Sequence, residues 1–185
     1  MEFSRTEIPD LILCKPAVHY DDRGYFMETF RKDTLEAFLN KPLHFCQDNE
    51  SQSTRGVLRG LHYQLPHFAQ AKLVRVISGA VLDVAVDIRK NSKTYGKSVA
   101  IELNDKNKCQ LYIPKGFAHG YVVLSDTAIF SYKVDNYYDR DAERGILFND
   151  PLLNIDWQIP ENEMLISQKD RNLSSFNNAD KFDQH

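Results

Sequence analysis

The chain has 185 residues, of which 42% are hydrophobic and 26% are charged, and its formal net charge is −3. This length suits a single domain with a buried core, and a general nucleic-acid binder would normally be basic. No apolar run is long enough to span a membrane, and the first residues lack the apolar stretch of a signal peptide. We therefore expect a cytoplasmic protein with neither nucleic acid nor a membrane as its partner.

The three cysteines Cys14, Cys46 and Cys109 are far apart and odd in number. They lack the CxxC spacing of a zinc site and do not form a disulfide framework. We interpret them as small hydrophobic residues of a protein in a reducing compartment.

The first predicted element is a helix. Asp33 and Glu36 have the spacing of a capping box, and Leu35, Phe38 and Leu39 follow as an apolar stripe. The sequence therefore predicts a short helix that begins at Asp33.

Most of the remaining chain has the pattern of short β-strands. Apolar residues alternate from Ala80 to Ile88, while Asp83 and Asp87 fall on the other face, which is typical of a half-buried strand. Strands at this spacing, with turn residues between them, favour a β-sandwich or barrel in one domain, residues 1–185. Further strands are predicted at 72–77, 99–103, 111–113, 119–124 and 128–134, with a loop at 135–150, a polar tail from 167, and fraying at 177–185.

Two histidines stand beside glycines in strand-like runs. His62 lies in Val57-Leu-Arg-Gly-Leu-His-Tyr-Gln64, and regular alternation would point its side chain away from Arg59, unless a bulge at Gly60 brings Arg59 round. His119 ends the pattern Pro-x-Gly-x-x-His, which in cupin barrels can supply a metal ligand. The accompanying His-x-His is absent, because the corresponding residues are His-Tyr-Gln, so we expect no metal.

Two further polar side chains fall on apolar strands. Tyr132 alternates with Phe130 and Val134, so its ring points to the interior, where its hydroxyl needs a partner. Lys72 precedes Leu73 and Val74, and a buried lysine is costly unless it is paired or used. A core tyrosine and a lysine that extends to water are the structural alternatives.

Taken together, these motifs resemble the dTDP-4-dehydrorhamnose 3,5-epimerase family, a nucleotide-sugar epimerase family of the cupin superfamily. The resemblance runs through nearly the whole chain. It implies a mainly β fold, a cupin-type jelly-roll barrel with a few short helices, which acts as a homodimer and needs no metal or cofactor. The matching segments are Asp22-Arg-Gly24 with Glu28, Gln47-Asp-Asn49, Val57 to Gln64, Lys72-Leu-Val, Asp83 to Arg89, Ile113 to Gly120, Tyr132, Tyr137-Tyr138, Glu143 and Ser167-Gln-Lys-Asp170.

The resemblance also implies roles for individual residues. His62 would be the general base, Asp170 the carboxylate bonded to it, Tyr132 the proton donor on the opposite face of the sugar, and Lys72 the group near the 4-keto oxygen. The substrate-binding residues implied by the family are Arg23, Glu28, Gln47, Asn49, Arg59, His119, Glu143 and Lys169, some of them reaching the site of the partner subunit.

The implied reaction is epimerisation at C3 and C5 of dTDP-4-keto-6-deoxyglucose to dTDP-4-keto-rhamnose, a step of dTDP-L-rhamnose biosynthesis. An isomerase of this kind removes a proton next to a ketone, which histidine can accept near neutral pH. Relatives that invert only C3 or only C5 share the same base and acid, so a single-site epimerase is the alternative. A metal-dependent cupin and a carbohydrate-binding cupin without activity are the two other classes to be tested.

Overall fold

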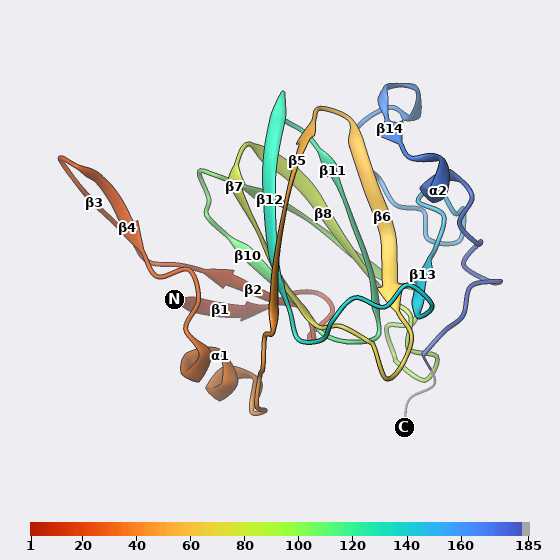
Figure 1. The fold of residues 1–185 in the computed structure, drawn as a ribbon, viewed down its shortest axis with the longest axis horizontal. Coiled ribbons are helices and arrows are strands. Elements are labelled where there is room, and N and C mark those ends of the chain that lie inside the picture. The colour runs from red at the N-terminus through yellow and green to blue at the C-terminus, as the bar shows by residue number, and fades with distance from the viewer. Residues whose placement is uncertain (183–185) are drawn as a thin grey trace.

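Two β-sheets pack face to face and form the body of the molecule (Figure 1). The structure is a computed structural model that describes residues 1–182. The first sheet has the strand order β1-β2-β10-β7-β12-β5, and the second has the order β13-β6-β11-β8-β9 with β14 added beside β6. The expected mainly β fold is confirmed, although the two sheets remain separate and do not close into one continuous barrel.

The strands are antiparallel to their neighbours except for β14, which runs parallel to β6. The elements are β1 (Glu2–Arg5), β2 (Ile12–Lys15), β3 (Val18–Asp21), β4 (Gly24–Met27), α1 (Lys32–Leu39), β5 (Gln47–Thr54), β6 (Val57–Gln64), β7 (Lys72–Ser78), β8 (Ala80–Asp87), β9 (Ser98–Asn104), β10 (Gln110–Ile113), β11 (Phe117–Val123), β12 (Thr127–Val134), β13 (Glu143–Gly145), the 3-10 turn η1 (Glu161–Glu163), β14 (Leu165–Ile166) and α2 (Gln168–Arg171).

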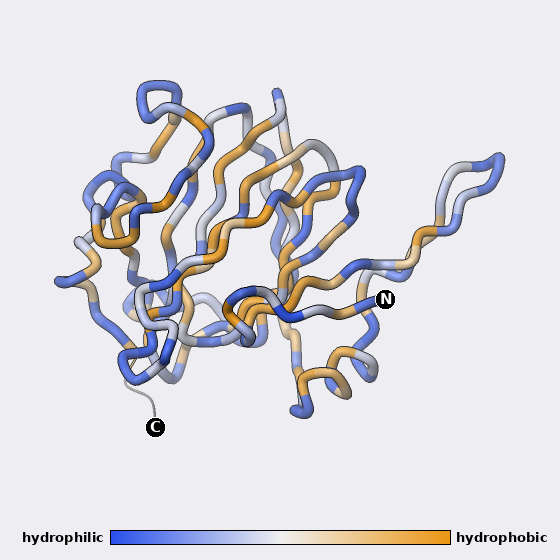
Figure 2. Tube along the Cα trace, turned by 180° about the vertical axis from the view of Figure 1, so that it is seen from behind, coloured by the Kyte–Doolittle hydropathy of each residue, from blue (hydrophilic) through white to orange (hydrophobic). Residues whose placement is uncertain are grey.

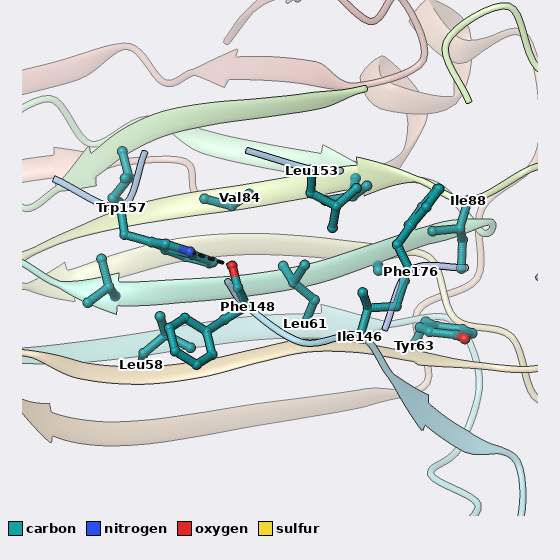
Figure 3. Close-up of a cluster of buried hydrophobic side chains, with 14 of the residues drawn as sticks. Leu58, Leu61, Tyr63, Val84, Ile88, Ile146, Phe148, Leu153, Trp157 and Phe176 are labelled. Atoms are coloured by element: carbon teal, nitrogen blue, oxygen red, sulfur yellow. Dashed lines mark hydrogen bonds between the residues drawn. The ribbon is translucent and has the colours of Figure 1, made fainter. Parts of the chain in front are cut away.

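Strand β8 is buried on both faces, so the prediction of a half-buried strand is wrong. Its larger apolar side chains, such as Leu82 and Val84, do not face the first sheet. They pack against the chain that follows β13, including Phe148 and Trp157, whose indole N–H donates to the Phe148 carbonyl (Figure 3). The other face of β8, which bears Asp83, points between the sheets. Both faces are buried because the C-terminal segment covers the face that a simple sandwich would expose.

The space between the sheets holds a second apolar cluster. It includes Val74 and Phe130 from the first sheet and Val81, Ala85 and Tyr121 from the second. The rings of Phe130 and Tyr121 stack with centroids 4.2 Å apart, so aromatic packing joins the sheets at this level.

Helix α1 covers part of the outer face of the first sheet through Leu35. It begins at Lys32 with Arg31 as its N-cap, and no side chain caps it, so the predicted capping box at Asp33 is wrong. The Glu36 carboxylate instead accepts a hydrogen bond from the Leu43 backbone, beyond the end of the helix. Within residues 1–182, no helix is long and apolar enough to cross a membrane.

Three predictions for the C-terminal half need correction. The expected loop at 135–150 contains β13, which pairs with β6, and the expected polar tail forms α2 after its N-cap Ser167. Residues 177–182 are not frayed, because the Phe182 carbonyl accepts from the Lys90 backbone and Asp180 pairs with Arg144. The rest of that predicted tail, residues 183–185, lies outside the described residues.

The hairpin of β3 and β4 extends away from both sheets (Figure 1). Its aromatic side chains are among the most exposed of the molecule, with Tyr20 71% and Phe26 73% exposed. The trace turns hydrophilic toward the hairpin tip, in contrast to the hydrophobic strands of the body (Figure 2). Exposed aromatic rings on a projecting hairpin are typical of a surface that another molecule covers.

Strands β6 and β11 approach closely at two glycines. A Cβ atom on Gly60 would lie 2.5 Å from Gly120 Cα, and one on Gly120 would lie 2.7 Å from the Arg59 carbonyl oxygen. His119 pairs with His62 and Tyr121 with Arg59, so two residues of β6 oppose the single Gly120. This bulge is the one anticipated at Gly60. Because of it, Arg59 and His62 line the same cavity, whereas regular alternation would have pointed their side chains in opposite directions.

The variant Gly60→Ala tests this contact. Gly60 has φ +127°, which L side chains rarely adopt, and its Cβ would overlap Gly120. We expect the free energy of unfolding, measured by urea titration, to fall by roughly 2 kcal/mol more than in the control Gly24→Ala. Gly24 has the same φ, but its Cβ would meet no atom within 4 Å. Equal losses in the two variants would show that the close approach of the strands is unimportant.

Candidate active site

A cavity of about 500 Å³ lies between the two sheets, a size that suits a small-molecule ligand. Residues of both sheets line it, together with the segment from β14 to α2. Its side chains are Glu50, Ser51, Val57, Leu58, Arg59, His62, Lys72, His119, Tyr121, Phe130, Tyr132, Leu165, Ser167, Lys169 and Asp170.

His62 and Asp170 form a hydrogen-bonded pair at one side of the cavity. The distance between His62 Nε2 and Asp170 Oδ1 is 2.7 Å, and the Asp170 carboxylate is almost completely buried. Burial raises the pKa of Asp170, but the hydrogen bond and charge of His62 outweigh it, so the net pKa lies below its ordinary value. Asp170 therefore stays ionised near neutral pH, and can orient the imidazole and stabilise its protonated form.

The local fold holds Asp170 at this position. Strand β14 runs beside β6, with Ile166 opposite Leu58, and delivers the chain to the single turn of α2. The Ser167 hydroxyl caps that turn by accepting from the Asp170 backbone N–H. The carboxylate is thereby placed next to β6 although Asp170 and His62 are 108 residues apart in sequence.

Tyr132 lies on β12 of the first sheet, whereas His62 lies on β6 of the second. Both side chains line the cavity, so a ligand between the sheets would have the imidazole and the phenol on different sides. Burial, reinforced by Tyr121, raises the pKa of Tyr132, although Arg59 opposes the shift. The phenol is therefore protonated near neutral pH and available as an acid.

Lys72, at the start of β7, also lines the cavity. Burial lowers the pKa of Lys72 to about 8, although the carboxylates of Asp83 and Glu143 act in the opposite direction. The lysine is thus cationic near neutral pH and close to losing its proton.

Arg59 and His119 lie on the neighbouring strands β6 and β11, and both border the cavity. The Arg59 guanidinium donates to the Ser53 hydroxyl over 3.3 and 3.2 Å, which leaves further donors free for a ligand. His119 is buried and is hydrogen-bonded to Asp83. Burial lowers the pKa of His119, and the nearby carboxylate of Asp83 only partly opposes this.

Glu143 and Lys169 form an ion pair at the rim. Lys169 Nζ lies 2.5 Å from Glu143 Oε2, which also accepts from the Tyr138 hydroxyl over 2.9 Å. Lys169 borders the cavity, whereas Glu143 lies on β13 behind it. The pair connects α2 to β13, which pairs with β6, and so supports the position of Asp170 next to His62.

Four other candidate residues do not line this cavity. Arg23 lies at the turn of the β3–β4 hairpin in an exposed ion pair with Asp21, and Glu28 is exposed just after β4. Gln47 and Asn49 lie on β5, bonded to each other, and alternation places them on the same face as Ser51, which does line the cavity. Within one chain, the hairpin candidates are therefore separated from the remaining site.

The comparisons with known proteins agree with this geometry. The chain matches the model of a family described as dTDP-4-dehydrorhamnose 3,5-epimerase over residues 5–178. A protein of that name from Shigella flexneri is 52% identical over 182 residues, covering 98% of this chain and 99% of the relative. The chain belongs to the dTDP-4-dehydrorhamnose 3,5-epimerase family. It is accordingly an isomerase.

Solved structures extend the match to three dimensions. The epimerase from Elizabethkingia anophelis has a TM-score of 0.93 at 50% identity, covering 96% of this chain and 97% of that one. The enzyme from Legionella pneumophila, in complex with dTDP-4-keto-L-rhamnose, also has a TM-score of 0.93, at 45% identity, covering 97% and 94% of the two chains. The cupin-like fold of the epimerase family is therefore the fold of this chain.

Sequence reasoning missed two polar contacts of this epimerase site. The Ser51 and Tyr121 hydroxyls lie 2.9 Å apart at the cavity wall, and the buried Asp83 holds His119. Strand alternation places Ser51 and Tyr121 inward, but only the pairing of the sheets shows that they meet. Within residues 1–182, no group of three or more histidine, cysteine or acidic side chains has an arrangement that could hold a metal ion.

The lowered pKa of Lys72 can be measured directly. In ¹³C NMR of the reductively methylated protein, we expect one dimethyl-lysine signal to titrate with a midpoint of about 8. Most other lysines should titrate at ~10.4. The signal should be missing in Lys72→Arg, which identifies it. A Lys72 signal that titrates with the surface lysines would contradict the burial of this ammonium group.

Proposed function

We propose that this enzyme converts dTDP-4-keto-6-deoxyglucose to dTDP-4-keto-rhamnose by inverting C3 and C5, without a metal or cofactor, for dTDP-L-rhamnose biosynthesis. The observation that supports this most strongly is the pair of His62 and Asp170 on one sheet side of the cavity, with Tyr132 on the other. The names of the relatives, and the ketosugar nucleotide in the Legionella complex, agree with this substrate.

In each inversion, His62 takes the proton from the carbon next to the ketone. The electrons of the broken C–H bond form a carbon–carbon double bond to C4, and the carbonyl electron pair moves onto the 4-oxygen as an enolate. Lys72, cationic near neutral pH, stabilises that charge. Tyr132 then gives its proton to the opposite face of the same carbon, and exchange with water restores the imidazole and the phenol.

Cationic side chains make the cavity suitable for a diphosphate. Arg59, Lys72 and Lys169 border it, against the carboxylates of Glu50 and Asp170. Arg59 has donors left over beyond its bonds to Ser53 and can bind phosphate oxygens, whereas Lys169 is held at the rim by Glu143. We therefore assign substrate binding to Arg59, His119, Glu143 and Lys169, with Glu143 acting through its ion pair to Lys169.

Hydrogen exchange tests the assigned base and acid separately. With dTDP-4-keto-6-deoxyglucose in deuterated water, wild-type protein should introduce deuterium at C3 and C5, as followed by proton NMR. His62→Ala and Asp170→Asn should each slow exchange by roughly 10²-fold or more, because a positioned base contributes about that much. Tyr132→Phe should slow completed inversion more than proton removal.

The controls are His44→Ala and Tyr137→Phe, which change exposed residues that do not border the cavity. Both should retain wild-type exchange. Full exchange in His62→Ala would refute the base, and deuterium at one carbon in the wild-type protein would make it a single-site epimerase. Binding without any exchange would support a non-catalytic cupin, and activity that is lost to a chelator and restored by a metal would support a metal enzyme.

We also propose that the enzyme is a homodimer in which each β3–β4 hairpin completes the site of the partner subunit. The hairpin projects from its own sheets, exposes Tyr20, Tyr25 and Phe26, and bears Arg23 away from the cavity of its own chain (Figure 1). A two-fold symmetric exchange would bury both hairpins at once. Arg23 and Glu28 would then contact the nucleotide sugar together with Gln47 and Asn49.

Subunit mixing tests the exchange. His62→Ala and the double variant Arg23→Ala/Phe26→Ala should each be inactive, but after unfolding and co-refolding in equal amounts they should regain about a quarter of the wild-type activity, because half of the dimers then hold one intact site. Light scattering would report the dimer. Activity that does not return, although mixed dimers are present, would show that the hairpin serves its own chain.

The cysteines indicate the compartment in which the enzyme works. Cys14, Cys46 and Cys109 are all free, which is typical of proteins in a reducing environment. We accordingly propose a cytoplasmic enzyme, with neither nucleic acid nor membrane as partner.

A further inference from the structure

Two hydroxyl groups meet at the wall of the cavity and have no role in the reaction described above. Ser51 lies on β5 of the first sheet and Tyr121 on β11 of the second, and their oxygens are 2.9 Å apart. The Tyr121 ring is buried and stacks on Phe130, with centroids 4.2 Å apart. Both side chains of this hydroxyl pair line the cavity, so the pair is a fixed polar point in its wall.

The hydroxyl pair retains hydrogen-bonding capacity for a ligand. The two groups carry two hydrogens, and their mutual bond uses one of them, whichever oxygen is the donor. Among residues 1–182, neither oxygen has another hydrogen-bond partner. One O–H donor and further acceptor lone pairs therefore remain at the cavity wall. Because hydroxyl groups are uncharged, the pair suits a neutral hydroxyl of a ligand, which both donates and accepts.

The strand register places the hydroxyl pair beside the residues assigned to proton transfer. On β11, Tyr121 is two residues from His119, which pairs with His62. On β12, the residue opposite Ser51 is two residues from Tyr132. Two residues of a strand span roughly 7 Å. On each sheet, the pair is therefore one strand repeat from the level of the base or of the acid.

We infer that the hydroxyl pair of Ser51 and Tyr121 binds the 2-hydroxyl of the sugar and makes the enzyme selective for substrates that carry it. The proposed substrate has free sugar hydroxyls only at C2 and C3, because C1 carries the diphosphate, C4 is the ketone and C6 is a methyl group. The C3 hydroxyl changes its orientation when C3 is inverted, so one fixed contact could not hold it in both substrate and product. The C2 hydroxyl keeps its configuration throughout. This inference rests on the proposed function for the identity of the sugar.

The position of Arg59 agrees with this choice of hydroxyl. Arg59 lies opposite Tyr121 in the pairing of β6 with β11, and its guanidinium has donors left for phosphate oxygens. In the substrate, C2 lies between C1, which carries the diphosphate, and C3, which loses a proton to His62. A group that is level with the phosphate-binding arginine and one strand repeat from the base therefore faces C2.

A thermodynamic cycle between the protein hydroxyl and the sugar hydroxyl tests the contact. Tyr121→Phe keeps the ring and its stacking but removes the oxygen. With dTDP-4-keto-6-deoxyglucose, we expect kcat/KM to fall about tenfold, because a lost neutral hydrogen bond has an effect of that order. With the 2-deoxy analogue, wild-type protein should be slower by a similar factor, and Tyr121→Phe should cause no further loss. Equal losses with both substrates would show a purely structural hydroxyl and overturn the inference.

Tyr63→Phe is the matched control. Tyr63 is also a buried tyrosine, but its hydroxyl donates to the Asp180 carbonyl and its side chain does not border the cavity. The ratio of kcat/KM for the two substrates should stay at the wild-type value. Ser51→Ala serves if Tyr121→Phe does not fold, and should lose the same preference for the 2-hydroxyl. Coupling of Tyr121 to a 3-deoxy analogue in place of the 2-deoxy one would contradict the assignment.

Binding separates this inference from the proposed reaction. Because dTDP-glucose has no ketone, calorimetry with it and with its 2-deoxy analogue measures the hydroxyl contact alone. Wild-type protein should bind dTDP-glucose about tenfold more tightly, and Tyr121→Phe should bind the two alike. If wild-type protein shows this preference but exchanges no sugar protons, the proposed reaction is wrong and the hydroxyl site stands. A preference that persists in Tyr121→Phe would refute the site.

Discussion

The close approach of β6 and β11 is the constraint on which the rest of the site depends. Gly60 and Gly120 meet where any Cβ atom would overlap the opposite backbone, and the resulting bulge turns Arg59 and His62 to the same side of β6. Without the bulge, strand alternation would direct one of them into the cluster that contains Leu58 and Leu61. Two small residues thus determine that a cation and a base face one ligand.

Each of the two imidazoles in the cavity is paired with a buried carboxylate. Asp170 supports His62 from α2, and Asp83 supports His119 from β8. Each carboxylate is almost completely removed from water, so its charge acts on its partner with little screening. Among residues 1–182, no hydrogen-bonded or ion-paired partner is shown for Lys72, and burial lowers its pKa. The site therefore combines two supported imidazoles with one ammonium close to its titration point.

The sequence predicts which residues share one face of a strand better than it predicts what packs against that face. Alternation correctly places most strands, because side-chain direction in a strand depends only on residue parity. It gives the wrong burial for β8, since the segment containing Phe148 and Trp157 returns to cover the face that would otherwise meet water. The partnership of His62 with Asp170 spans 108 residues and depends on the parallel pairing of β14 with β6. No local pattern contains that information, and only the family resemblance anticipated it.

The placement of acid and base on different sheets has a mechanical consequence. Tyr132 belongs to β12 and His62 to β6, so the gap between them is set by how the two sheets pack. At that level the stacked rings of Phe130 and Tyr121 join β12 to β11, the strand that pairs with β6. A change in this aromatic contact would alter the distance across the cavity without touching either reacting group. Because inversion requires the proton to leave from one face and arrive at the other, the inter-sheet core is as much a part of the epimerase site as the residues that transfer protons.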